Sequence, residues 1–107
     1  MKNYKWNAIA YEKYSQGQQK WARELIEKIS LKGTENVLDI GCGDGKVTAE
    51  FSKLVSKGSI IGIDNSAAMI KLASDRHSEA IYPNLSFQEM DTRNLQFNDR
   101  FDLIFSN

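Results

Sequence analysis

The sequence predicts an α/β fold, a doubly wound parallel sheet of about four strands with flanking helices. Short apolar runs that suit buried strands alternate with segments in which apolar residues recur at helical spacing. Helical crossovers between strands are typical of parallel sheets with helices packed on their faces. The 107 residues, 41% hydrophobic and 26% charged, suffice for one domain with an ordinary core.

Charge and composition exclude several classes of protein. Fourteen basic and fourteen acidic residues cancel and are interspersed, which argues against nucleic acid as a partner. No apolar run approaches the roughly 18 residues of a membrane span, and the first residues lack the apolar core of a signal peptide. We therefore expect a cytoplasmic protein without a membrane partner. A single cysteine, Cys42, and a single histidine, His77, lie far apart, so no metal site is expected.

Residues 1–33 are predicted to form an N-terminal helical arm. The first 16 residues mix aromatic and polar side chains without a clear period, as in a loose segment. From Gln18 onward, apolar residues recur at i, i+4 and i+8, namely Trp21, Leu25 and Ile29, which predicts an amphipathic helix. This helix should end before Lys32 and Gly33.

Residues 34–107 are predicted to form the β-α-β-α-β-β core. The nearly continuous apolar run 37–40 suits a parallel strand buried on both faces. A helix should begin after Gly45 and stop at Gly58. Its apolar stripe consists of Val47, Phe51, Leu54 and Val55.

The second half of this core follows the same pattern. Residues 59–63 form a strand that ends in Asp64, and Ser66 can cap the helix that follows. Residues 85–90 alternate polar and apolar side chains, which is typical of an edge strand with one wetter face. The last predicted strand covers residues 101–105.

Each predicted strand ends in glycine or polar residues. Since ligands of open α/β sheets bind outside the carboxyl ends of the strands, these four ends should line one crevice. Glycine takes positive φ without strain and has no Cβ to hold a ligand away from the backbone. The strand ends are residues 41–45, residues 64–66, Asp91 with Thr92, and Ser106 with Asn107.

The glycine turn discriminates between two kinds of cofactor. A dinucleotide site reads G-x-G-x-x-G, but Lys46 occupies the place of the third glycine when the motif starts at Gly41. A start at Gly43 fails as well, because Thr48 occupies the last place. The observed D-x-G-x-G-x-G, from Asp39 to Gly45, instead resembles the first motif of the class I S-adenosylmethionine-dependent methyltransferases, which have a Rossmann-like fold.

The resemblance covers the whole chain. In that family the acid after the second strand binds the ribose hydroxyls, an acid after the third strand binds the adenine amino group, and the end of the fourth strand lies beside the methionine part. These places hold Asp64, Asp91 and Asn107. Within the family the chain is most similar to the trans-aconitate methyltransferase group, on the opening residues Trp6, Asn7 and Tyr11 and on residues 62–69 and 102–107.

The resemblance implies S-adenosylmethionine as the cofactor and a small-molecule methyl acceptor, with a carboxylate as the candidate. Glycines let the methionine part approach the main chain, Asp39 can help hold its amino group, Asp64 can accept both ribose hydroxyls, and Met69 can pack on adenine. No catalytic base is expected, because the sulfonium is already an activated donor. The implied cofactor-binding residues are Asp39, Gly41, Cys42, Gly43, Asp64, Asn65, Met69, Asp91, Thr92 and Asn107.

Other readings of the same residues stay open. The three aspartates are also common turn or capping residues, and Met69 suits an apolar core. Trp6 and Tyr11 are either surface aromatics or part of a lid over the cofactor. The function classes that compete with methyl transfer are a dinucleotide-binding oxidoreductase domain and a non-catalytic module of methyltransferase fold.

The chain stops where methyltransferases of this family continue with a helix and about three more strands, which carry much of the acceptor pocket. We therefore expect residues 1–107 to be the N-terminal part of a single methyltransferase domain, truncated after the fourth strand. The apolar strand 101–105 would then be an unpaired edge, through which self-association is expected.

Overall fold

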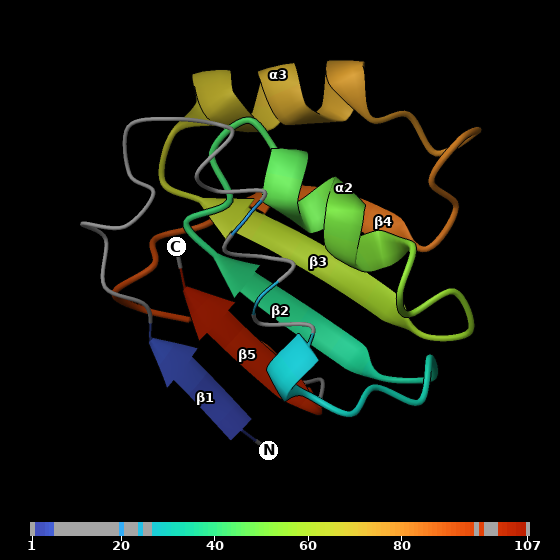
Figure 1. Ribbon diagram of the computed structural model, residues 1–107. Helices are drawn as coiled ribbons and strands as arrows, with labels where there is room; N and C mark the ends of the chain where they lie inside the picture. The colour runs from blue at the N-terminus through green and yellow to red at the C-terminus, as the bar shows by residue number, and fades with distance from the viewer. Residues whose placement is uncertain are drawn as a thin grey trace.

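The computed structural model describes residues 2–5, 20, 24, 27–95, 97 and 101–106. Its five strands form one sheet in the order β1-β5-β2-β3-β4, and all neighbouring strands are parallel (Figure 1). This arrangement confirms the predicted fold class. The elements are β1 (Lys2–Lys5), β2 (Asn36–Ile40), α2 (Lys46–Ser52), β3 (Ser59–Asp64), α3 (Ala67–Arg76), β4 (Leu85–Glu89) and β5 (Leu103–Ser106).

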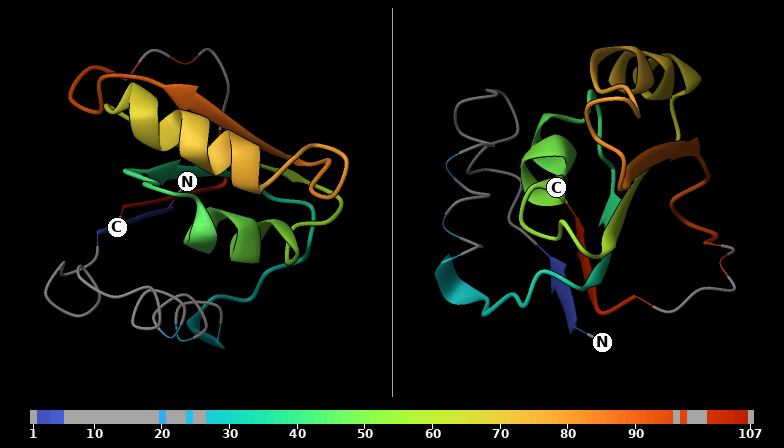
Figure 2. Two further views of the ribbon diagram at one scale, coloured as in Figure 1. Left: turned by 90° about the horizontal axis from the view of Figure 1, so that it is seen from above. Right: turned by 90° about the vertical axis from the view of Figure 1, so that its right-hand side faces the viewer.

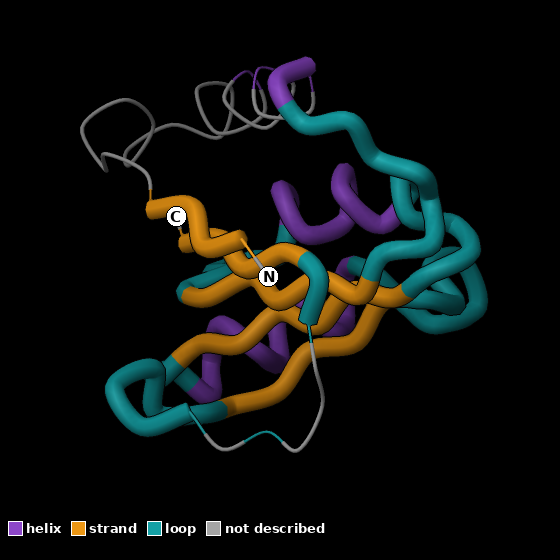
Figure 3. Tube along the Cα trace, turned by 90° about the horizontal axis from the view of Figure 1, so that it is seen from below, coloured by secondary structure: helices purple, strands orange, loops and turns teal. Residues whose placement is uncertain are grey.

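Strand β1 corrects two expectations about the ends of the chain. It lies where the sequence predicts a loose helical arm, and the tube shows it close to the C-terminal strand (Figure 3). It pairs in parallel with β5, from Lys2 opposite Leu103 to Lys5 opposite Ser106. Strand β5 pairs with β2 on its other side, so its edge is not exposed. This strand forms through backbone pairing with β5. Residues 2–5 show no alternation of apolar and polar side chains from which a strand could be predicted. The described positions 20, 24, 27 and 28 are helical, as predicted for that part of the arm.

The starts of α2 and α3 and the bounds of β2, β3 and β4 agree with the sequence to within one residue. The predicted end of the first helix is wrong, because α2 ends at Ser52 rather than at Gly58, so Leu54 and Val55 of its predicted stripe lie beyond the helix. Ser66 caps α3, as predicted, because its Oγ accepts the Met69 N–H at 3.2 Å. Strand β4 pairs with β3 alone among the described strands, which confirms its predicted place at the edge. Strand β5 begins at Leu103 rather than at Phe101, whose side chain is buried in an apolar cluster instead.

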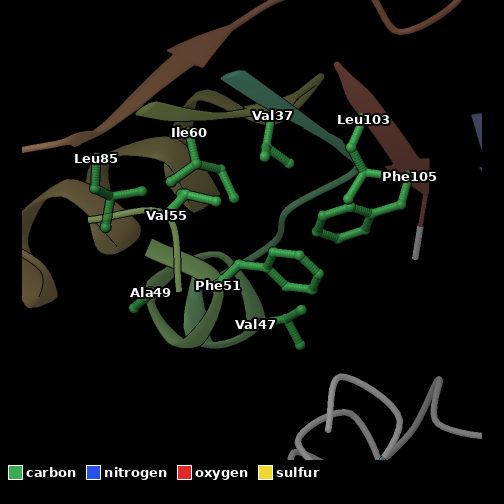
Figure 4. Close-up of a cluster of buried hydrophobic side chains, with 9 residues drawn as sticks. All are labelled: Val37, Val47, Ala49, Phe51, Val55, Ile60, Leu85, Leu103 and Phe105. Carbon is green, nitrogen blue, oxygen red and sulfur yellow. The ribbon is translucent and has the colours of Figure 1, made fainter. Parts of the chain in front are cut away.

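Helices α2 and α3 lie on the same face of the sheet (Figure 2). The core on this face is a layer of buried side chains between α2 and the strands, in which the rings of Phe51 and Phe105 lie 4.7 Å apart (Figure 4). This layer consists of Val37, Val47, Ala49, Phe51, Val55, Ile60, Leu85, Leu103 and Phe105.

A smaller cluster forms on the opposite face of the sheet. Leu38 and Ile63 pack there with Phe101, which comes from the segment between β4 and β5. Apolar side chains therefore cover both faces of the central strands, which explains the nearly continuous apolar runs of β2 and β3. The polar residues that the sequence singles out collect at the carboxyl ends of the strands.

Candidate functional site

The carboxyl ends of β2, β3 and β4 meet at one edge of the sheet, because the three strands are parallel and in register. Residues 41–45 follow β2, Asp64 ends β3, and Asp91 and Thr92 follow β4. The predicted site residues of these segments are thus on one edge. Asn107, the last of the predicted residues, lies outside the described part of the chain.

The glycines of the loop after β2 adopt backbone angles that other residues avoid. Gly41, Gly43 and Gly45 have φ values of 78°, 57° and 84°. A Cβ at Gly43 would meet no atom of the described residues within 4 Å, whereas a Cβ at Gly45 would lie 2.6 Å from the ring of Phe87. Gly45 is therefore required by packing, and Gly43 presents open backbone that a ligand can approach.

Strand β3 anchors this loop through its last residues. The N–H groups of Gly41 and Cys42 both donate to the Ile63 carbonyl, at 2.8 and 2.9 Å. The Gly43 N–H donates to Asp64 Oδ2 at 3.0 Å, and Asp64 Oδ1 accepts the Ser66 N–H at 2.9 Å. One half-buried carboxylate thus joins the glycine loop to the start of α3. Its remaining lone pairs can accept further hydrogen bonds.

Asp39 is the buried acid of the site. Its side chain is 0% exposed, and Oδ2 accepts a hydrogen bond of 2.7 Å from the Thr48 hydroxyl. Oδ1 is buried and has no hydrogen-bond partner among the described residues. Burial raises the pKa of Asp39 to about 7, the Thr48 bond opposes this rise, and the negative charge of Asp64 adds to it.

Cys42 fills a gap beside the sheet. A Cβ at Gly62 would lie 2.9 Å from Cys42 Cβ, so the small side chain occupies the space that this glycine leaves. Burial raises the pKa of the Cys42 thiol far above its usual range, and the nearby charges of Asp39 and Asp64 act in the same direction. A thiol in this environment stays protonated and is a poor nucleophile.

The ends of β3 and β4 are joined by a second contact. The Thr92 N–H donates to Asn65 Oδ1 at 2.7 Å, so two predicted site residues bind each other. The exposed carboxylate of Asp91 accepts hydrogen bonds from Arg93, with Nε to Oδ1 at 3.2 Å, and this arginine lowers its pKa. A hollow of about 400 Å³ lies here, lined by Asn65, Glu89, Met90, Asp91 and Arg93.

The structure therefore groups the predicted residues in two sets. Gly41, Cys42, Gly43 and Asp64 form the loop and its anchor, while Asn65, Thr92 and Asp91 lie beside the hollow. Met69 lies in the first turn of α3.

Two further residues of the site were not predicted from the sequence. Thr48 binds Asp39, and Arg93 binds Asp91. The position of Thr48 on the buried side of α2 is only a weak sequence signal for a polar role, because threonine also occurs as a packing residue.

The family model described as "Methyltransferase domain" matches residues 37–107. Trans-aconitate 2-methyltransferase of Escherichia coli K12 is 37% identical over 95% of this chain. Malonyl-[acyl-carrier protein] O-methyltransferase of Bacillus cereus is 32% identical over 99% of the chain. The chain spans 38% and 40% of the length of these two relatives.

The fold of this chain is also similar to that of a protein whose structure has been solved with a bound ligand. The structure of PKMT2 from Rickettsia typhi, in complex with S-adenosylhomocysteine, matches with a TM-score of 0.64 and 31% sequence identity. The match covers 72% of this chain and 15% of that protein.

No helix in the described part of this chain is long and apolar enough to cross a membrane.

Proposed function

Because this chain belongs to the methyltransferase domain family, we propose that its strand ends bind S-adenosylmethionine and that the protein transfers the methyl group to a small-molecule acceptor. The bound cofactor would supply an activated methyl group on a sulfonium. The residues of the chain then have to bind it, orient it and exclude water.

The observation that carries this proposal is the open backbone at Gly43, held in place by Asp64. The loop leaves space on the side where a Cβ would point, which suits close approach of a ligand to the main chain. The Asp64 carboxylate holds the loop through the Gly43 N–H and keeps acceptor capacity for ribose hydroxyls. The residues present therefore fit the cofactor that the family uses.

The remaining residues of the site suit the other parts of the cofactor. We propose that the amino-acid end lies near Gly41 and Gly43, with Asp39 beneath it. The hollow beside Asp91 would take the adenine, with Asp91 as the acceptor for its amino group and Met69 as an apolar contact. Asn65 and Thr92, which bind each other, would hold the two strand ends at the spacing that the adenine needs.

The acceptor is proposed to be a carboxylate on a small molecule. Trans-aconitate, the acceptor named for the Escherichia coli relative, is a carboxylate, and a malonyl group, named for the Bacillus relative, also carries one. Two relatives that match nearly the whole chain thus share this chemistry. Methylation of a carboxylate oxygen needs no base, since that oxygen is already ionised at neutral pH.

We further propose that the chain is the cofactor-binding, N-terminal part of a single methyltransferase domain. The family match begins at the first residues of β2 and extends through β5. The two relatives are more than twice as long as this chain. In those relatives, residues outside the matched part are available to form an acceptor pocket.

Calorimetric titration of the chain with S-adenosylhomocysteine tests the cofactor assignment, with NAD as the control ligand. We expect binding of S-adenosylhomocysteine, no heat with NAD, and affinity at least about tenfold weaker in Asp64→Asn, which corresponds to about 1.4 kcal/mol. Asp102→Asn is the matched control, because Asp102 accepts the Asn36 N–H at the amino ends of the strands. Equal affinity of both variants, or binding of NAD instead, would refute the proposal.

A further inference from the structure

Asp39 and Thr48 form a polar pair inside an otherwise mostly apolar layer. Both residues are 0% exposed, and Thr48 lies on α2 next to Val47, which belongs to the main core cluster. The Thr48 hydroxyl donates to Asp39 Oδ2 at 2.7 Å. A buried polar group of this kind is costly unless hydrogen bonds compensate it, so the pair calls for a physical explanation.

The compensation is incomplete in the described structure. A carboxylate offers about four lone-pair positions, and one hydroxyl proton satisfies only one of them. Asp39 Oδ1 is buried and has no hydrogen-bond partner among the described residues. This leaves one oxygen fixed by Thr48 and the other free to hold a proton.

The charged groups around Asp39 favour the protonated form. Burial raises the pKa of Asp39, and the negative charge of Asp64, at the end of β3, raises it further. Burial raises the pKa of the Cys42 thiol, in the loop after β2, so this thiol stays neutral and adds no negative charge. From α2, Thr48 contributes a hydrogen bond that only partly offsets these effects. The Asp39 carboxyl group is therefore expected to change its charge near neutral pH.

We propose that Thr48 is a positioning residue that fixes Asp39 Oδ2, so that below neutral pH Asp39 carries a proton on Oδ1 in the free protein and releases it when a cationic amino group binds at the glycine loop. The Oδ1–H bond breaks heterolytically, the electron pair stays on the carboxylate, and the proton passes to the solvent buffer. The ligand in this inference is that of the proposed function. The protonation of Asp39 and the role of Thr48 concern the free chain and do not depend on the ligand.

The free chain is tested by carbon NMR titration of aspartate carboxyl groups, with Asp39→Asn to assign the signal. We expect a titration midpoint near 7. The midpoint should rise in Thr48→Val, which keeps the side-chain shape but removes the hydroxyl, and return in Thr48→Ser. Asp102→Asn is the control that leaves this signal unchanged. A carboxyl that stays ionised from pH 5 to pH 8, or a midpoint equal in Thr48→Val and Thr48→Ser, would overturn the inference.

The ligand step is tested by calorimetry in two buffers of different ionisation enthalpy. S-adenosylhomocysteine should release about 0.9 proton at pH 6 and almost none at pH 8.5, as a group of pKa near 7 requires. Methylthioadenosine, which lacks the amino-acid end, should release none at either pH. Binding of S-adenosylhomocysteine without proton release at pH 6 would contradict the inference. Absence of any binding would refute the proposed function, while the titration of the free chain would still decide the role of Thr48.

Discussion

At the scale of single residues, the site depends on two aspartates near the carboxyl ends of neighbouring strands that lie in different environments. Asp64 is half-buried, and each of its two oxygens accepts one backbone N–H, which leaves lone pairs for further hydrogen bonds. Asp39 is fully buried and only partly satisfied, so its charge depends on pH. The sequence predicts both acids at their strand ends. The difference between them comes from tertiary burial, which the local sequence does not reveal.

Asp39 should make the stability of the chain fall as the pH rises. Its folded pKa of about 7 lies above the ordinary value of 3.8, so the folded state binds more protons than the unfolded state between these values. Stability is therefore expected to decrease by up to about 4 kcal/mol from pH 4 to pH 7 on account of this group, and to change little above. Urea unfolding followed by circular dichroism at several pH values measures this dependence.

Asp39→Asn removes the titrating group and should flatten that dependence, while Asp102→Asn should leave it as in the parent chain. Comparing variants at each pH cancels the contribution of other groups, including His77, whose pKa is lowered by burial. An identical pH dependence in the Asp39→Asn variant and the parent chain would show that Asp39 is ionised in the folded state throughout.

Gly43→Ala should impair binding more than it impairs folding. Its φ of 57° makes any Cβ residue strained by about 1 to 2 kcal/mol, and the new methyl group would point into the open space at the loop. Gly33→Ala is the matched control, because Gly33 has φ of 94°. Among the described residues, the nearest contact of a Cβ there would be the Leu54 carbonyl at 3.7 Å, an ordinary distance. Both variants should lose similar stability, and only Gly43→Ala should weaken binding of S-adenosylhomocysteine. Equal affinity in the two variants would argue against close approach at Gly43.

At the scale of elements, the strands and helices of the core were predictable because burial on both faces and helical periodicity leave strong patterns in residues 34–90. Strand β1 was not predictable, because it forms by pairing with a strand about 100 residues away in sequence and its own residues carry no alternation. The cap at Ser66 was predictable, since a serine before an apolar helical pattern is a local signal.

A long-range contact stabilises the end of α2. The Asn84 amide donates to the carbonyl of Ser52, the last residue of α2, and to the carbonyl of Val55 in the turn that follows, both at 2.8 Å. Asn84→Ala should lower the free energy of unfolding by about 1 to 3 kcal/mol, measured by urea denaturation. Asn94→Ala, at an exposed position after β4, should change it by less than about 0.5 kcal/mol. Similar small losses in both variants would show that the Asn84 contacts contribute little.

At the scale of the whole molecule, the parallel direction of the strands brings their carboxyl ends to one edge, and the candidate site lies at that edge. The fold class and the edge where the ligand should bind were predictable from the sequence. The pairing of β5 on both sides was not, and it changes the expectation for association.

Removal of residues 1–5 should expose the edge of β5 and promote self-association. Size-exclusion chromatography with light scattering, over a range of protein concentrations, should give a larger mass for the shortened chain than for the full chain. The same mass for both chains at every concentration would indicate that β1 does not protect this edge.

The most direct test of the central claim is to map S-adenosylhomocysteine onto the chain by the changes it causes in backbone amide NMR signals. We expect large shifts for residues 41–45 and 64–69 and for Asp91 and Thr92. We expect no shifts for Glu35, Gly58 and Ser59 at the amino ends of the strands. Shifts confined to the amino ends, or none in the glycine loop at saturating ligand, would contradict the claim that the carboxyl edge of this sheet binds the methyl donor.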